Sequence, residues 1–303
     1  MRTVAGEVER ALSVLLGLES VSLVVAGRTD AGVHAWGQVA SYDGPVVAVR
    51  SLNALLPADV SVLSCEEAAP GFDARRDATS RAYCYRVLLR RPRSVFEGGR
   101  ALWWPRRLEF PQLALCASAL VGTHDFTAFT PTDTEHVRFS RDVFAAFWRW
   151  GGGAGDGMGG RSLLALGGAG GMGTFRIGGP PGGAAAAEGR RTPEGTREGR
   201  RMAEGTGEGQ RTPEGRRMPE RRRTPEGTSA HILEFWIEAD AFMRQMIRVL
   251  IGTMLEVGGG RRSVESFVSL LSGSPRSAAG RTAPAHGLYL AGVGYGGERV
   301  LSV

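Results

Sequence analysis

The residues best suited to chemistry in this chain lie in one short loop at residues 26–35. The loop reads Ala-Gly-Arg-Thr-Asp-Ala-Gly-Val-His-Ala and directly follows an apolar, β-branched run at 21–25 that is typical of a buried strand. Gly27 ends the run and Gly32 permits a second sharp turn. Rigid scaffolds present functional side chains on such loops, so Asp30 is a candidate catalytic carboxylate. The alternative is an Asx turn, in which Asp30 only caps nearby backbone N–H groups.

A second group of candidate functional residues is an arginine-rich segment at 75–107. The whole chain carries a formal net charge of +6, and none of its 37 basic residues is lysine. Residues 75–107 contain ten arginines against two acids, interleaved with tyrosine, phenylalanine and tryptophan. Phosphates require cations, and unstacked bases require flat faces, so this composition indicates an RNA-binding surface. A solvated, solubilising face is the alternative.

Composition excludes several other classes of protein. At 303 residues the chain can form two modest domains with a substantial core. It has no apolar run of membrane-spanning length and no signal-peptide pattern, so we expect a cytoplasmic protein without a membrane partner. The three cysteines and five histidines show no ligand spacing, which predicts neither a disulfide framework nor a metal site.

Hydrophobic periodicity predicts strands and helices in mixed order, which indicates an α+β fold. The expected helices lie at 5–16, 108–120, 241–256 and 263–272, and the expected strands at 21–26, 36–42, 60–65, 82–90, 141–149, 231–239 and 288–295. In the strand at 82–90, Tyr83 and Tyr85 share one face.

Residues 151–229 differ in kind from the rest of the chain. They hold 24 of the 45 glycines, few large apolar residues and three copies of Arg-Thr-Pro-Glu-Gly. This composition predicts a disordered low-complexity insertion within a hairpin loop. A long surface loop costs little closure entropy, so an inert expansion is the simpler interpretation and an accessory RNA-binding tail is the alternative.

Several ordered blocks of the sequence resemble the TruA-type tRNA pseudouridine synthases. The loop at 26–35 is similar to that family's signature loop. The other blocks, in family order, are 36–40, 53–57, 72–75, 78–85, 122–129, 140–143, 241–248 and 285–290. Family members isomerise uridine to pseudouridine in the anticodon stem-loop of tRNA, at positions 38 to 40, without a cofactor or metal. The resemblance also implies a homodimer.

The resemblance assigns a role to individual residues. Asp30 matches the catalytic aspartate, acting as nucleophile or base. Arg248 matches the arginine that keeps this carboxylate ionised, and periodicity places it one helical turn after Arg244. Tyr83 matches the tyrosine that stacks on the uracil, and Arg28 is placed to contact the substrate RNA. A core aromatic and a plain surface arginine are the alternatives for Tyr83 and Arg248. The expected RNA-binding residues are Arg75, Arg76, Arg81 and Arg244.

The family fold implies two ferredoxin-like halves with joined antiparallel or mixed sheets and a central RNA-binding cleft. We expect a catalytic half at 1–95, and a second half at 96–150 plus 230–303. The family normally begins with a strand ahead of the helix that here starts near Thr3, and this sequence shows none of it. Its absence predicts an open strand edge in the first sheet.

Two other functions are compatible with these features. The first is a catalytically impaired RNA-binding protein of the same fold that lost activity with its opening strand, although the intact Asp30, Tyr83 and Arg248 argue against it. The second is a carboxylate-based hydrolase. Such an enzyme uses a second catalytic acid, and the sequence offers no candidate for it.

Overall fold

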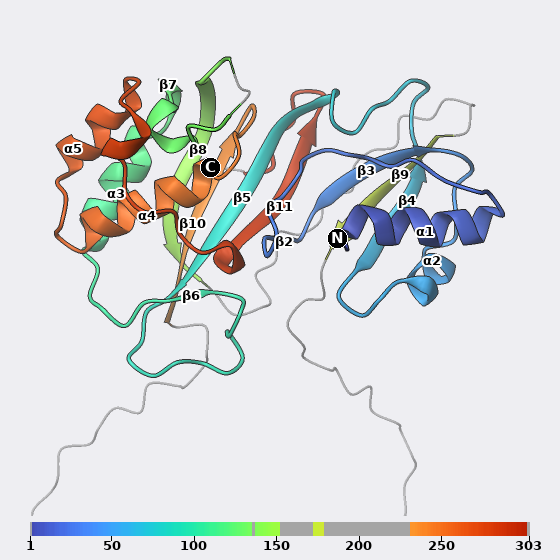
Figure 1. Ribbon diagram of the computed structural model, residues 1–303, viewed down its shortest axis with the longest axis horizontal. Coiled ribbons are helices and arrows are strands. Elements are labelled where there is room, and N and C mark those ends of the chain that lie inside the picture. The colour runs from blue at the N-terminus through green and yellow to red at the C-terminus, as the bar shows by residue number, and fades with distance from the viewer. Residues whose placement is uncertain (1, 135–136, 152–171, 179–230, 302–303) are drawn as a thin grey trace, which may run out of the picture.

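Two β-sheets lie side by side, each with helices packed on one face (Figure 1). This computed structural model describes residues 2–134, 137–151, 172–178 and 231–301. The strands pair mostly antiparallel, with two short parallel pairs, so the predicted α+β class with mixed sheets is confirmed.

Within the part of the chain that the structure describes, the first sheet has four strands in the order β1-β3-β9-β4. Their bounds are Val24–Val25, Gln38–Asp43, Met172–Gly178 and Ser61–Glu67. Helices α1 (Val4–Leu16) and α2 (Val49–Leu55) pack on it. The side chain of Thr3 caps α1 by accepting a hydrogen bond from the Gly6 N–H. Val8 and Leu12 face the core as their spacing predicts, because they lie one turn apart on the apolar face of α1.

Strand β9 corrects one sequence-based expectation. It comes from the segment 151–229, predicted to be disordered, and its backbone pairs antiparallel with β3 on one side and β4 on the other. The facing edges of β3 and β4 are therefore paired, and among the described residues the sheet ends at β1 on one side and at β4 on the other. The open strand edge expected from the missing opening strand stays a prediction. Composition failed here because a ladder of backbone hydrogen bonds does not require large apolar side chains. The rest of 151–229, apart from Gly151, lies outside the described residues.

The described residues give the second sheet seven strands, ordered β2-β11-β5-β10-β8-β7 with β6 beside β5. The bounds are His34–Ala35 for β2, Ala78–Leu88 for β5, Leu102–Trp103 for β6, Gly122–Asp125 for β7, Ser140–Trp150 for β8, Ile232–Ala239 for β10 and Leu288–Tyr295 for β11. In the centre, Tyr83 of β5 is paired with Ile237 of β10 and Leu290 of β11.

Three α-helices pack on this second sheet around the larger core. These are α3 (Phe110–Ala119), α4 (Met246–Gly258) and α5 (Val264–Val268). Short 3₁₀ turns lie at Thr127–Phe129, Ser269–Leu271, Arg276–Ala278 and Ala285–Gly287. Within the described ranges no helix is long and apolar enough to cross a membrane.

The two sheets meet at residues 34–38. Strand β2 pairs with β11 in the second sheet, and only Trp36 and Gly37 separate it from β3 in the first. The N–H groups of Trp36 and Gly37 both donate to the Leu290 carbonyl, at 2.8 and 3.3 Å. Since β2 and β5 both belong to the second sheet, the boundary expected near residue 95 does not coincide with the boundary between the sheets.

The position of β9 predicts a strong effect of proline in this strand. Thr174 is paired with Ser41 of β3 and Glu66 of β4. Thr174→Pro removes a backbone donor from a central strand, and should lower the free energy of unfolding by about 1–3 kcal/mol in denaturant titration. Thr174→Val keeps the N–H and serves as the control. Equal unfolding midpoints for the two variants would contradict the pairing of β9.

Candidate active site

Backbone and side-chain contacts fix the loop that carries Asp30. At its start, the Ala26 N–H donates to the Val39 carbonyl at 2.9 Å. The buried amide of Gln38 then clamps Gly27: its Nε2 donates to the Gly27 carbonyl at 2.7 Å, and its Oε1 accepts from the Gly27 N–H at 3.3 Å. Farther along, the Val33 N–H donates to the Asp30 carbonyl at 3.1 Å, which closes a turn. Sequence reasoning missed Gln38, although it lies in the 36–40 block.

The carboxylate of Asp30 faces the guanidinium of Arg248. Arg248 Nη1 donates to Asp30 Oδ2 at 2.8 Å, and the side chains of Asp30 and Arg248 are 27% and 17% exposed. This is the only hydrogen bond to the Asp30 carboxylate within the described part of the chain, which argues against the Asx-turn alternative. Partial burial strengthens the attraction between the two side chains.

Arg248 is itself held from the other side. Its Nε donates to the Ala283 carbonyl at 2.8 Å, and its own backbone carbonyl accepts from the Ala283 N–H at 2.9 Å. The close approach depends on Gly252, one turn along α4, where a Cβ would lie 1.6 Å from the Arg281 carbonyl oxygen. A larger residue at position 252 would displace the 281–283 segment. That segment supplies the Ala283 carbonyl that accepts from Arg248 Nε.

Tyr83 lies beside this ion pair. It is 8% exposed, and its ring meets Phe242 edge-on with 5.1 Å between the centroids. Burial, with a smaller contribution from the charge of Asp30, raises the pKa of Tyr83 to about 12. The hydroxyl therefore stays protonated at neutral pH. Tyr83 is a core aromatic and also lines the cleft, so the two sequence-based alternatives for this residue do not exclude each other.

These side chains line one small cleft of about 80 Å³ between the Asp30 loop, β5 and the start of α4. Its lining residues are Arg28, Thr29, Asp30, Val33, Tyr83, Phe242, Met243, Arg244, Gln245, Met246, Ile247, Arg248 and Leu288. The structure thus brings Asp30, Tyr83, Arg28 and Arg248 together from segments far apart in the sequence. Phe242 was missed as a lining residue, although it lies in the 241–248 block.

Periodicity predicted that Arg244 lies on the same helix as Arg248, and this prediction is wrong. Helix α4 begins at Met246, because Gln245 adopts a left-handed conformation at φ 60° and interrupts the helical backbone. Arg244 instead extends from the preceding turn, and its Nη2 pairs with Asp133 Oδ2 at 2.7 Å. This hydrogen bond raises the pKa of Arg244, at an exposed position on the rim of the cleft.

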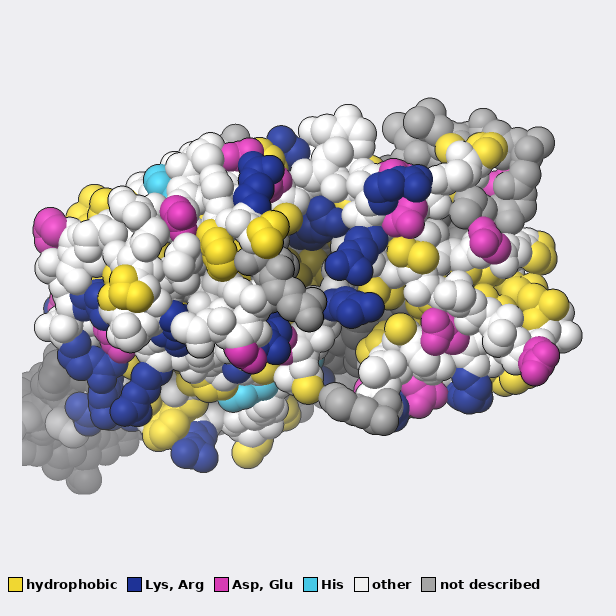
Figure 2. Space-filling view, turned by 45° about the horizontal axis from the view of Figure 1, so that its top comes forward, with side chains coloured by type: hydrophobic (Ala, Val, Ile, Leu, Met, Phe, Trp, Pro, Cys, Tyr) yellow, Lys and Arg dark blue, Asp and Glu magenta, His cyan; other side chains and the backbone are white. Residues whose placement is uncertain are grey.

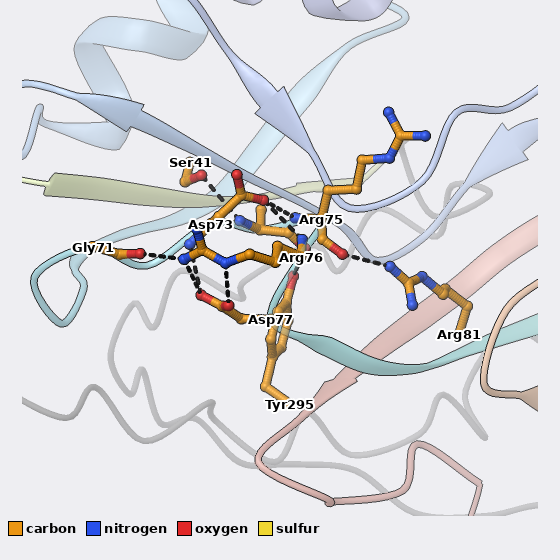
Figure 3. Close-up of polar contacts among 9 residues, drawn as sticks. Ser41, Gly71, Asp73, Arg75, Arg76, Asp77, Arg81 and Tyr295 are labelled. Atoms are coloured by element: carbon orange, nitrogen blue, oxygen red, sulfur yellow. Dashed lines mark hydrogen bonds and ion pairs between the residues drawn. The ribbon is translucent and has the colours of Figure 1, made fainter.

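The other three arginines expected to bind RNA differ in their contacts (Figure 3). Arg81 is half-buried, and its guanidinium donates to the carbonyls of Ala78, Asp240, Ala26 and Arg75. Arg76 pairs with Asp77 at 3.0 Å and donates to the Gly71 carbonyl. The structure therefore gives Arg81 an internal bonding role rather than the predicted phosphate contact, because backbone carbonyls occupy both of its terminal nitrogens.

The described ranges contain no group of three or more His, Cys, Asp or Glu side chains placed to hold an ion. Cys65, Cys84 and Cys116 are all free thiols.

The Arg248–Asp30 pair predicts a stability difference between two arginine variants. Arg248→Ala leaves a half-buried carboxylate without its charged partner, so it should cost about 2 kcal/mol and lower Tm by about 5 °C. Arg261→Ala changes an exposed arginine and should leave Tm within about 1 °C. Calorimetry of both variants checks this, and equal melting temperatures would contradict the pairing.

Comparison with known proteins gives the family. A sequence model of a protein family described as tRNA pseudouridine synthase matches residues 116–296. The tRNA pseudouridine synthase A of Thermus thermophilus is 32% identical, over 99% of this chain and 90% of the relative. The enzyme of the same name from Frankia casuarinae is 33% identical over 97% and 81%, and that of Bacillus subtilis 30% over 97% and 90%. This chain belongs to the tRNA pseudouridine synthase family.

Proposed function

We propose that this chain isomerises uridine to pseudouridine in the anticodon stem-loop of tRNA, at positions 38 to 40, with Asp30 as the catalytic aspartate. The single observation that carries the proposal is the 2.8 Å ion pair between Asp30 and Arg248 in a cleft that Tyr83 also lines. Membership of the family supports the reaction class. The anticodon positions rest on the motif resemblance.

The reaction breaks the N1–C1′ bond of the uridine and forms a C5–C1′ bond. The proton on C5 leaves and N1 gains one, so nothing is oxidised or added and the chemistry requires no cofactor. Asp30 acts on the sugar as nucleophile or base, and Arg248 holds its carboxylate in place through the 2.8 Å ion pair. Tyr83 supplies a flat face for the uracil, and Arg28 contacts the RNA beside the displaced nucleotide.

The larger arrangement is also part of the proposal. Two ferredoxin-like halves, one carrying the Asp30 loop and the other carrying Arg248, enclose the cleft that receives the RNA. The enzyme acts on tRNA in the cytoplasm as a homodimer. The rival function, an RNA-binding protein that has lost activity, does not account for a charge pair aimed into the cleft beside an aromatic wall.

Removal of the Asp30 charge should abolish the chemistry without loss of the fold. In Asp30→Asn, pseudouridine formation should fall by about 10³-fold or more, because the amide is neither nucleophile nor base. Tritium release from [5-³H]uridine-labelled tRNA measures turnover, and filter binding should give an unchanged tRNA affinity. Asp43→Asn, a change at an exposed carboxylate, is the control and should retain full activity. Substantial turnover by Asp30→Asn would overturn the assignment.

The two proposed properties of Tyr83 can be separated by substitution. We expect the Tyr83 ring to stack on the uracil and its protonated hydroxyl to take no part in the reaction. Tyr83→Phe should therefore keep kcat within about threefold. Tyr83→Ala removes the flat face and should lower kcat by about 10²-fold or more, since base stacking contributes about 1–3 kcal/mol in addition to positioning. Equal losses in both variants would indicate that the hydroxyl itself takes part.

A further inference from the structure

A short loop at residues 71–77 is held rigidly by its own carboxylates (Figure 3). Asp73 Oδ1 accepts from the N–H groups of Arg75 and Arg76, both at 2.8 Å, and these bonds lower the pKa of Asp73. Asp77 Oδ2 accepts from the Asp73 N–H at 2.8 Å, and the Asp77 N–H donates back to the Asp73 carbonyl. Because these N–H groups are already paired, they stabilise the turn and offer nothing to a ligand.

The same loop is bonded to both sheets. The Ala74 N–H donates to Ser41 Oγ on β3 at 3.1 Å, and the Ala74 carbonyl accepts from the Tyr295 hydroxyl on β11 at 2.7 Å. Arg81 Nη2, from β5, donates to the Arg75 carbonyl at 2.8 Å. The loop backbone therefore cannot shift unless contacts to both sheets are broken.

Arg75 is the arginine of this loop that remains available. The guanidinium of Arg76 pairs with the Asp77 carboxylate and donates to the Gly71 carbonyl, and the guanidinium of Arg81 donates to backbone carbonyls. The Arg75 side chain is exposed and has no polar partner among the described residues, and Figure 3 shows it pointing away from the cluster. Because the backbone of the loop is already fixed, an anion that binds here orders only the Arg75 side chain, and its planar guanidinium loses less entropy per hydrogen bond formed than a lysine would.

Arg81 also connects this loop to the candidate active site. The nitrogen that donates to the Arg75 carbonyl also donates to the Ala26 carbonyl at 3.1 Å. Ala26 opens the loop that carries Asp30. One guanidinium nitrogen thus fixes the position of the Arg75 backbone relative to the Asp30 loop. On the surface, Figure 2 shows basic side chains gathered along the recess between the two halves.

We propose that Arg75 is a positioning residue that binds a phosphate of the tRNA backbone while the target uridine is at Asp30. This rests on the proposed function. Guanidinium and phosphate form strong, often bidentate hydrogen bonds, and phosphate contacts set the register of a nucleic acid on a protein. The contact is made equally in the ground state and the transition state, so it acts on binding rather than on the chemical step.

The experiment compares Arg75→Ala with Arg76→Ala, which removes a neighbouring arginine whose charge Asp77 already neutralises. Filter binding of an unmodified tRNA transcript is measured from 0.05 to 0.3 M salt, together with KM, kcat and Tm. For Arg75→Ala, Kd and KM should rise about tenfold, kcat should stay within about twofold, and the salt slope should fall by about one. The Tm should stay at the parent value, and Arg75→Lys should recover part of the affinity.

In Arg76→Ala the salt slope should stay at the parent value, although Tm should fall because the loop loses an internal pair. An unchanged slope in Arg75→Ala, or equal loss of tRNA affinity in both variants, would overturn the phosphate contact. A parent chain that binds tRNA but forms no pseudouridine would instead overturn the proposed function, and the binding comparison would still decide the role of Arg75.

Discussion

The ion pair between Asp30 and Arg248 is the interaction on which the rest of the arrangement depends. Asp30 lies on a loop between a strand of the first sheet and a strand of the second, whereas Arg248 belongs to a helix packed on the second sheet. Neither charge is fully solvated, so each is stable in place only when the other lies opposite it. The two sheets must therefore be joined at one fixed register, which the Leu290 carbonyl provides by accepting from Trp36 and Gly37.

The arginine is positioned by backbone packing rather than by other charges. Gly252 allows α4 to touch the 281–283 segment, and the Thr253 hydroxyl accepts from the Gly280 N–H at 3.0 Å. These contacts bring the Ala283 carbonyl to Arg248 Nε and leave Nη1 directed at Asp30. A side chain that donates in two fixed directions has little freedom to leave the carboxylate, which is how preorganised electrostatics is built.

Local sequence patterns predicted most of the strands, because alternation and β-branched runs survive into the fold, as on β5 and β10. They could not predict the start of α4, since the left-handed Gln245 interrupts an apolar helical pattern that continues through residues 241–256. Strand β9 was missed because its role is carried by backbone pairing with β3 and β4. The motif resemblance gave Asp30 and Arg248 as partners, but the clamping of Gly27 by Gln38 is a tertiary contact that no local spacing reveals.

The arginines show why charge counted along a sequence overstates the surface available to RNA. A guanidinium has five donors, and its role is set by the acceptors that the fold places around it. Carbonyls of four residues surround Arg81, and carboxylates meet Arg76 and Arg244, so these three arginines already have partners within the protein. Arg75 and Arg28 are arginines as well, but their guanidinium groups have no such acceptors among the described residues. In a chain whose basic residues are all arginine, the supply of internal acceptors therefore decides which cations can meet a phosphate.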